Sequence, residues 1–205
     1  MKILVGVVTS VLVMLYPVAI WVGLTHFSAR TVGLWIVGLL LPVTVVRFRR
    51  AAREDLFAVL RIPLVILACV LPSVLFDDRR FVLVMPVLIN IALLATFGLS
   101  LRGTPMVERF ARMQETEGLS DAQVAHCRQV TIAWVVFFLL NASVAAGLAL
   151  FAPLAWWATY NGGIAYGLMG LMFAGEYVLR QARFRRYGAG LHDRVLSRIF
   201  PPRQP

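Results

Sequence analysis

Acidic residues are scarce in this chain, and so are the side chains that most enzymes use for catalysis. Its 205 residues include 10 Asp and Glu, 3 His and 2 Cys. No histidine stands in a ligand cluster, and the chain has no phosphate-binding glycine loop, no Gly-x-Ser-x-Gly elbow and no His-Glu-x-x-His pair. The sequence therefore favours a protein with no catalytic residues, no cofactor and no metal.

The two cysteines lie in different settings, which argues against a disulfide. Cys69 falls inside a long apolar run, whereas Cys127 falls in a polar connecting segment. A disulfide needs two α-carbons within about 7 Å of each other and an oxidising compartment, and neither is expected here. Neither cysteine has a metal-like spacing to a second ligand.

Apolar residues, by contrast, are abundant and gathered into long runs. They make up 60% of the chain, with a mean hydropathy of +0.81, whereas a soluble domain is about 45–50% apolar. Because about 20 apolar residues cross a membrane as a helix, we expect an all-α, polytopic membrane protein with six transmembrane helices in a bundle. The expected spans are Ile3–Leu24, Thr31–Val46, Phe57–Phe76, Phe81–Leu101, Val130–Ala152 and Trp156–Leu179. Residues 1–180 then form the transmembrane domain, and residues 181–205 form a basic cytoplasmic tail.

The distribution of positive charge predicts the orientation of these spans. The chain has 20 Lys and Arg residues and a formal net charge of +10. If the N-terminus is cytoplasmic, sixteen of the 20 lie on the cytoplasmic side: Lys2, Arg47, Arg49, Arg50, Arg53, Arg102, Arg109, Arg112, Arg128 and the seven arginines from Arg180 to Arg203. Since cytoplasmic loops carry an excess of Lys and Arg, we expect both termini in the cytoplasm. The expected partners of these arginines are anionic lipid headgroups and not nucleic acid.

The first span is expected to be retained and not cleaved as a signal peptide. Its apolar stretch is longer than the about 7–15 residues of a signal-peptide core, and it leads into Thr25–Ser28, a poor cleavage site. We therefore count Ile3–Leu24 among the six spans.

The longest internal loop, residues 102–129, contains the pattern of a short amphipathic helix. Thr104 and Pro105 resemble a helix start, with Thr104 as the N-cap and Pro105 in the first turn. Apolar residues then recur at helical spacing with charged residues between them: Met106, Val107, Phe110 and Met113. We expect a short cytoplasmic helix that lies on the inner face of the membrane.

The only charged connection expected on the outer side is the turn Asp77-Asp78-Arg79-Arg80. Its two acids and two bases cancel in charge. The favoured interpretation is a solvated hairpin with local ion pairs, which are common on surfaces and contribute little. A metal or phosphate site is the alternative, although two adjacent carboxylates alone supply few oxygen ligands.

Polar side chains inside the spans are costly in lipid and are the default candidates for function. Asn90 and Asn141 are expected to join helices by hydrogen bonds worth about 0.6–2 kcal/mol each. Glu176 lies four residues before Arg180, the spacing of an ion pair along one face of a helix. A proton-relay role for Glu176 is the alternative, and it would need an ionisable partner deep in the bundle.

The last span has small residues on one helix face, at Gly163, Gly167, Gly170 and Ala174. Such a stripe lets another helix approach closely. A groove for a lipid or polyene chain is the alternative interpretation. At the start of this span, aromatic side chains are expected to form a belt at the outer membrane–water interface: Trp156, Trp157 and Tyr160.

A set of stretches in a fixed order allows a comparison with a known family: Val46–Arg50, Phe76–Phe81, Pro105–Arg109, Thr131–Phe138, Asn141, Trp157 and Glu176–Arg180. This pattern resembles the bacterial intracellular septation protein A family of inner-membrane proteins, and the Ala-Trp-x-x-Phe-Phe segment around Trp134 is its most specific part. The chain departs from the family at Asn161, where the family has a basic residue. It looks closer to a sister group often encoded among genes for aryl polyene or xanthomonadin-type pigments.

The resemblance implies a multi-pass protein of the bacterial inner membrane with a role in the cell envelope, and it supplies no catalytic residue. The first hypothesis is a non-enzymatic protein supporting envelope maintenance, septation or assembly of a lipid or pigment pathway, with envelope-synthesis or division proteins as partners. The second is a component of aryl polyene biosynthesis that binds or moves a lipid or polyene chain. A small transporter or an enzyme of unknown type is the third, and the sparse intramembrane charge argues against an ion-coupled pump. The ligand and the oligomeric state, including a homo-oligomer, stay open.

Overall fold

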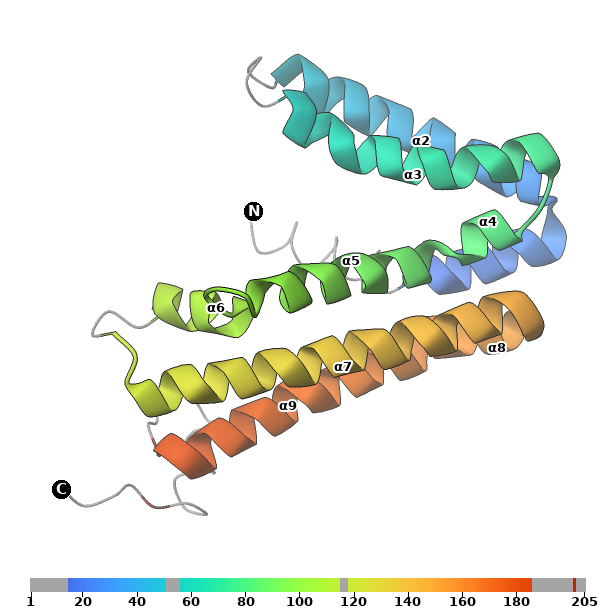
Figure 1. Ribbon diagram of the computed structural model, residues 1–205. Coiled ribbons are helices and arrows are strands. Elements are labelled where there is room, and N and C mark those ends of the chain that lie inside the picture. Colours follow the sequence, from blue (N-terminus) through green and yellow to red (C-terminus); the bar gives the residue numbers. More distant parts are fainter. Residues whose placement is uncertain (1–14, 51–55, 115–117, 186–200, 202–205) are drawn as a thin grey trace. The chain divides into compact units, whose positions relative to one another are not determined.

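A computed structural model describes residues 15–50, 56–114, 118–185 and 201 (Figure 1). All regular structure in these ranges is helical, which confirms the all-α prediction for the described residues. The elements are a helix over residues 15–26, α2 (Ala29–Arg50), α3 (Leu56–Phe76), α4 (Arg80–Leu83), α5 (Met85–Ser100), α6 (Met106–Gln114), α7 (Asp121–Phe151), α8 (Leu154–Thr159), the π-helical turn η2 (Tyr160–Ile164) and α9 (Ala165–Phe184). The chain divides into two units, Met1–Gly163 and Ile164–Pro205, which are described separately.

Three helical stretches among the described residues are long and apolar enough to cross a membrane. They are Arg80–Ser100, Asp121–Phe151 and Leu154–Phe184. Two shorter apolar stretches, Ala29–Pro42 and Ile66–Phe76, lie in α2 and α3. Helix length therefore supports the membrane class predicted from composition. The first fourteen residues, and with them most of the first expected span, lie outside the described residues.

Helix α7 begins nine residues earlier than the apolar run that predicted it. The run starts at Val130, but the helix starts at Asp121, after the N-cap residue Ser120. The backbone N–H of Ser120 donates to Gln123 Oε1 over 2.9 Å, which is half of a capping box. At 1.5 Å per residue, the 31 residues of α7 extend about 46 Å. This exceeds a hydrocarbon core of about 30 Å, so α7 projects beyond one face of a membrane it crosses.

The fourth expected span, Phe81–Leu101, contains a helix boundary. Helix α4 ends at Leu83 and α5 begins at Met85, with Pro86 in its first turn. Proline has no backbone N–H and cannot continue the hydrogen-bond ladder. At this boundary the carbonyl oxygen of Leu83 accepts the indole N–H of Trp157 over 3.1 Å, so a side chain from α8 satisfies a backbone group there.

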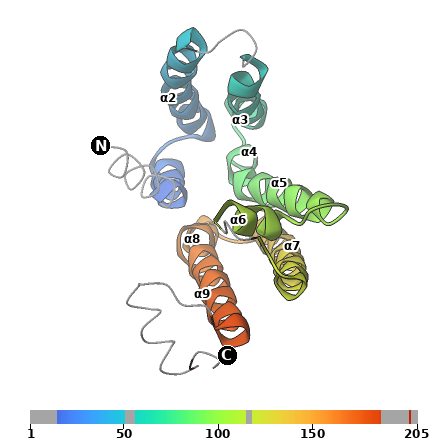
Figure 2. The ribbon, with the colours of Figure 1, turned by 90° about the vertical axis from the view of Figure 1, so that its left-hand side faces the viewer.

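Helices α2 and α3 lie side by side in both ribbon views (Figures 1 and 2). They approach closely at Gly33, where an added Cβ would lie 2.7 Å from both Ser73 Oγ and Val74 Cγ2. The hydroxyl of Ser73, which is fully buried, donates to the Val70 carbonyl over 2.7 Å. The backbone N–H of Arg30 donates to Asp77 Oδ1 over 2.7 Å, which ties the start of α2 to the end of α3.

A second packed region joins α4, α8, residues 15–26 and the start of α2. Its centre is Trp157, which has no exposed surface. The other buried apolar members are Ile20, Val32, Val82, Leu83, Leu154 and Ala158. This cluster packs the α4–α5 boundary against α8. By fixing the positions of these helices, it places the polar residues of α5, α7 and α8 near one another.

Candidate functional site

The buried polar side chains of the first unit form a chain of hydrogen bonds across three helical elements. Tyr160 Oη donates to Asn141 Oδ1 over 2.7 Å, and Asn141 Nδ2 donates to Asn90 Oδ1 over 2.9 Å. Asn90 Nδ2 in turn donates to the carbonyl of Pro86 over 2.8 Å. Every donor in this series points in the same direction, from η2 through α7 to α5. We call Asn90, Asn141 and Tyr160 the asparagine–tyrosine network.

Pro86 also explains why the network ends where it does. An amide side chain on a helix often bonds the carbonyl one turn earlier, and Asn90 lies four residues after Pro86. Asn90 and Asn141 are 7% and 5% exposed. Because unpaired polar groups in lipid cost several kcal/mol each, the two asparagines stabilise the α5–α7 contact chiefly by satisfying one another.

An aromatic cluster lies on the same two helices, beyond the asparagines. Trp134 stacks on Phe138 with ring centroids 5.4 Å apart, and it meets Phe137 edge-on at 5.5 Å. Phe97 of α5 meets Phe138 edge-on at 5.2 Å. Such aromatic pairs are worth about 0.5–1.5 kcal/mol each beyond the area they bury. The Ala-Trp-x-x-Phe-Phe segment is thus the apolar half of the α5–α7 contact.

The start of the last predicted span does not form the expected aromatic belt. Trp156 is 65% exposed, as a belt residue would be, but Trp157 is fully buried and bonds the Leu83 carbonyl. Tyr160 is directed to Asn141. The belt prediction was wrong for Trp157, because this side chain is buried in the cluster with α4. For the half-buried Tyr160 it stays a prediction.

Asn161 takes part in the local geometry of this segment. It is 5% exposed, and its Nδ2 donates to the carbonyl of Trp157 over 2.9 Å. The segment Tyr160–Ile164 is a π-helical turn, which adds one residue to a helical turn and is found frequently at functional sites. At this turn Asn161 is buried and Tyr160 is half-buried.

The outer turn differs from the predicted hairpin with local ion pairs. Asp77 Oδ1 accepts the backbone N–H of Arg30, and Asp78 Oδ1 accepts that of Arg80 over 2.9 Å. Both carboxylates therefore bind the first turns of helices, where a negative charge is stabilised by the helix dipole. Within the described ranges they form no ion pair with Arg79 or Arg80, so that part of the prediction was wrong.

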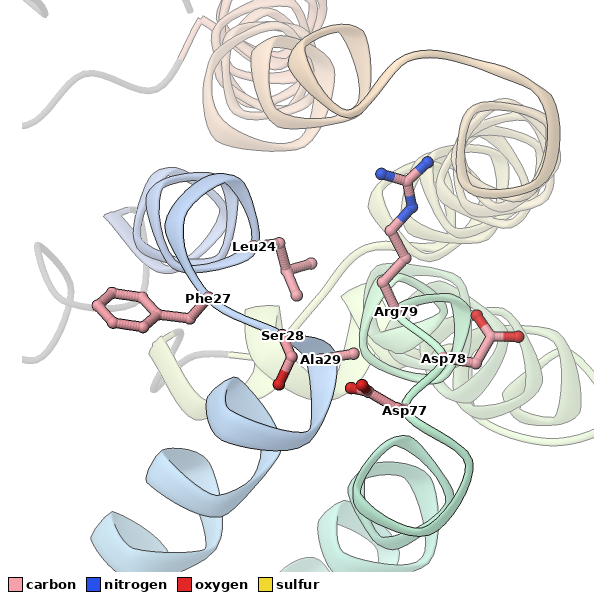
Figure 3. A pocket seen from close by; sticks show the side chains of 7 residues that line it. All are labelled: Leu24, Phe27, Ser28, Ala29, Asp77, Asp78 and Arg79. Atoms are coloured by element: carbon pink, nitrogen blue, oxygen red, sulfur yellow. The ribbon is translucent and has the colours of Figure 1, made fainter.

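A pocket of about 330 Å³ lies beside this turn (Figure 3). It is lined by Leu24, Phe27, Ser28, Ala29, Asp77, Asp78 and Arg79. Asp77 has a positive φ of 52°, which aspartate tolerates better than most residues. No group of three His, Cys, Asp or Glu able to hold a metal ion occurs in the described part of the chain, so the metal interpretation of the turn gains no support.

The second unit contains the expected ion pair. Arg180 Nε lies 3.5 Å from Glu176 Oε1, and the Arg180 guanidinium carbon lies 5.9 Å from the Tyr177 ring centroid. The side chains of Arg180 and Glu176 are 43% and 20% exposed. A pair that faces solvent to this extent contributes about 0–1 kcal/mol.

The glycines of the small-residue stripe have no close neighbour among the described residues. A Cβ atom built at Gly163, Gly167 or Gly170 would meet nothing within 4 Å. Its role in helix packing therefore stays a prediction. A glycine that does permit close approach is Gly33 on α2, which no pattern in the sequence marks.

The described residues are thus helical, with three helices long and apolar enough to cross a membrane and a polar and aromatic core at the junction of α5, α7 and α8. Comparison of the chain with family models, curated proteins and solved structures finds no match. The assignment of a function therefore depends on the chemistry of the core and on the sequence patterns alone.

Proposed function

We propose that this chain is a non-enzymatic protein of a bacterial inner membrane that supports the cell envelope as a scaffold. The observation that carries the proposal is the use of the buried polar side chains in the candidate spans. Asn90, Asn141, Tyr160, Trp157 and Asn161 all make hydrogen bonds that hold helices or helix boundaries in place. Directional hydrogen bonds between helices fix their register in lipid, as a scaffold requires.

We further propose six spans with both termini in the cytoplasm. Helices α2 and α3 have 22 and 21 residues, and at 1.5 Å per residue each is about 32 Å long, enough to cross a core of about 30 Å. Adding them and the segment that ends at residue 26 to the three candidate spans gives six. The asymmetric placement of Lys and Arg supports the proposed orientation.

Reporter fusions test this topology. A periplasm-active phosphatase fused after Asp78 should be active, and the same reporter fused after Gln204 should be inactive, because the two sites lie on opposite faces in the six-span arrangement. A fluorescent protein that folds only in the cytoplasm serves as the reciprocal control and should give the opposite pattern. Phosphatase activity at Gln204 would contradict both the number of spans and their orientation.

The resemblance to the septation protein A family and its pigment-associated sister group supports an envelope role. For a scaffold, Glu176→Gln should leave function nearly intact, because the Glu176–Arg180 pair is partly exposed and contributes about 0–1 kcal/mol. The measurement is complementation of a deletion strain, scored for envelope integrity and for pigment, with the amount of protein in the membrane quantified beside it.

The control for this experiment is Trp157→Ala, which should lower protein abundance and complementation together, because it removes a fully buried side chain. If Glu176→Gln abolished either phenotype at normal abundance, the scaffold proposal would fail. The result would then favour a transporter or an enzyme in which the carboxylate moves a proton or binds a substrate.

A further inference from the structure

Three arginines from three different elements gather around the loop that follows α5. Arg102 lies in this loop, two residues after the end of α5. Arg109 of α6 donates through Nε to the carbonyl of Thr104 over 3.0 Å. Arg128 of α7 donates through Nη1 to the carbonyl of Leu101 over 3.1 Å. All three side chains are exposed. We call Arg102, Arg109 and Arg128 the arginine cluster.

The cluster lies at the end of the apolar part of both long helices. Ser100 is the last residue of one candidate span, and its Oγ accepts the backbone N–H of Met106 over 2.9 Å. Thr131 Oγ1 accepts the backbone N–H of Val107 over 3.3 Å. The apolar part of α7, Val130–Phe151, is about 33 Å long at 1.5 Å per residue, so it fills a core of about 30 Å. The loop Leu101–Pro105 is therefore placed at the level of the lipid headgroups.

The guanidinium groups keep donors for a ligand. An arginine side chain has five N–H donors in a fixed planar fork, and one donor each of Arg109 and Arg128 is used on the loop. Arg112 is engaged elsewhere, since its Nε and Nη2 both bind Glu108 Oε1, over 2.8 and 2.7 Å. Glu108 is 5% exposed, so its carboxylate is occupied by Arg112 and withdrawn from the surface.

Next to the cluster, α6 presents apolar side chains that stay exposed among the residues the structure describes. Phe110 is 49% exposed and Met113 is 73% exposed, whereas Val107 and Ala111, on the adjoining side of the helix, are partly buried. Helix α6 packs against α7 (Figures 1 and 2), and the backbone N–H of Val107 donates to Thr131 Oγ1 of α7 at this contact. The combination of exposed guanidinium groups with an exposed aromatic side chain is the one that anionic phospholipids bind.

From this arrangement we propose that the arginine cluster is a binding site for the phosphate-bearing headgroup of an anionic membrane phospholipid, with Phe110 against the adjoining acyl chain. Arginine recognises phosphate oxygens through parallel N–H donors. The carbonyls of Leu101 and Thr104 hold two of the three guanidinium groups in position before the lipid arrives. The proposal rests on the membrane placement argued above, but it is independent of the scaffold role and of the number of spans.

The test uses the full-length protein in detergent, titrated with phosphatidylglycerol and, separately, with phosphatidylcholine, and the bound lipid is measured by native mass spectrometry. The wild-type protein should bind phosphatidylglycerol more tightly. The double variant Arg102→Gln/Arg109→Gln should lose about fivefold in affinity for each arginine removed, the factor that corresponds to about 1 kcal/mol per basic residue at a membrane surface. Affinity for phosphatidylcholine should change much less.

The matched control is Arg79→Gln/Arg80→Gln, which removes two exposed arginines from the outer turn and should leave phosphatidylglycerol binding unchanged. If both double variants lost affinity equally, or if the wild type did not prefer phosphatidylglycerol, the site would be refuted. Should the first double variant not fold, Arg102→Gln alone gives the same test at about fivefold, because its side chain makes no hydrogen bond within the described residues.

A competition experiment identifies the source of the phosphate group. Glycerol phosphate and inorganic phosphate, added at the concentration of the lipid, should leave phosphatidylglycerol bound, because they lack the acyl chains that contact Phe110. Displacement of the lipid by either soluble anion would overturn the lipid assignment. An unaffected reporter topology beside a failed lipid test would reject this site while leaving the six-span proposal intact.

Discussion

Replacing Trp157 with Ala should lower the free energy of unfolding of this protein by about 3–5 kcal/mol, the usual cost of deleting a large buried aromatic side chain. Trp157 has no exposed surface and lies at the centre of the cluster that joins α4 and α8. The substitution also removes the indole N–H that satisfies the Leu83 carbonyl. Denaturant titration in detergent micelles, followed by circular dichroism, measures the change.

Two further variants separate the contributions. Trp157→Phe keeps most of the buried ring and removes the hydrogen bond, so it should cost less, with about 1 kcal/mol from the bond itself. Trp156→Ala is the positional control, because Trp156 is 65% exposed and its removal should change stability little. Equal losses for Trp156→Ala and Trp157→Ala would contradict the packing of α8 described above.

The contrast between these adjacent tryptophans illustrates which features the sequence predicts and which it does not. Hydropathy and run length predicted an all-helical protein with long apolar helices, since a helix must be about 20 residues long to cross the core. They did not predict which of Trp156 and Trp157 is buried. That depends on the rotation of the helix about its own axis, which is fixed by the packing of Trp157 against α4 and cannot be read from the local composition.

The asparagine–tyrosine network was predicted in part. The cost of burying amides in lipid marked Asn90 and Asn141 as helix-joining residues, and the structure brings them within 2.9 Å of each other. Tyr160 was assigned to the membrane surface, because tyrosine is common there. Its hydroxyl bonds Asn141 in the structure. Once it is buried, Asn141 Oδ1 needs a hydrogen-bond donor. The sequence does not show that Tyr160 is this donor, because only the tertiary arrangement brings the two side chains together.

The outer turn shows the same limit for charged residues. Two acids followed directly by two bases suggested local pairing, yet Asp77 and Asp78 bind backbone N–H groups at helix starts. Asp77 reaches Arg30, a residue 47 positions away. Its left-handed backbone, with φ at 52°, turns the chain between α3 and α4. The sequence of the turn alone favours ion pairs between neighbouring residues. In the fold, the carboxylates bind backbone N–H groups at helix N-termini instead.

Replacing Gly33 with Leu should destabilise the protein by about 3 kcal/mol, the upper part of the usual range for overpacking a tight contact. Even the first added carbon would lie 2.7 Å from Ser73 Oγ and from Val74 Cγ2. Ser73 cannot move without losing its bond to the Val70 carbonyl. The helices α2 and α3 must therefore separate. Cysteine cross-linking between the two helices, together with denaturant titration, measures both consequences.

Gly38→Leu is the matched control on the same helix, because an added Cβ at Gly38 would meet nothing within 4 Å. There the change should be neutral or stabilising by up to about 1 kcal/mol, since leucine favours the helix over glycine. A close helix contact can be predicted from sequence where small residues repeat at helical spacing, as they do on the last span. A single glycine opposite a buried serine leaves no such pattern, so the close contact becomes visible only once α3 is placed against α2. If Gly33→Leu and Gly38→Leu were equally stable, the α2–α3 contact would have to be looser than the 2.7 Å approach implies.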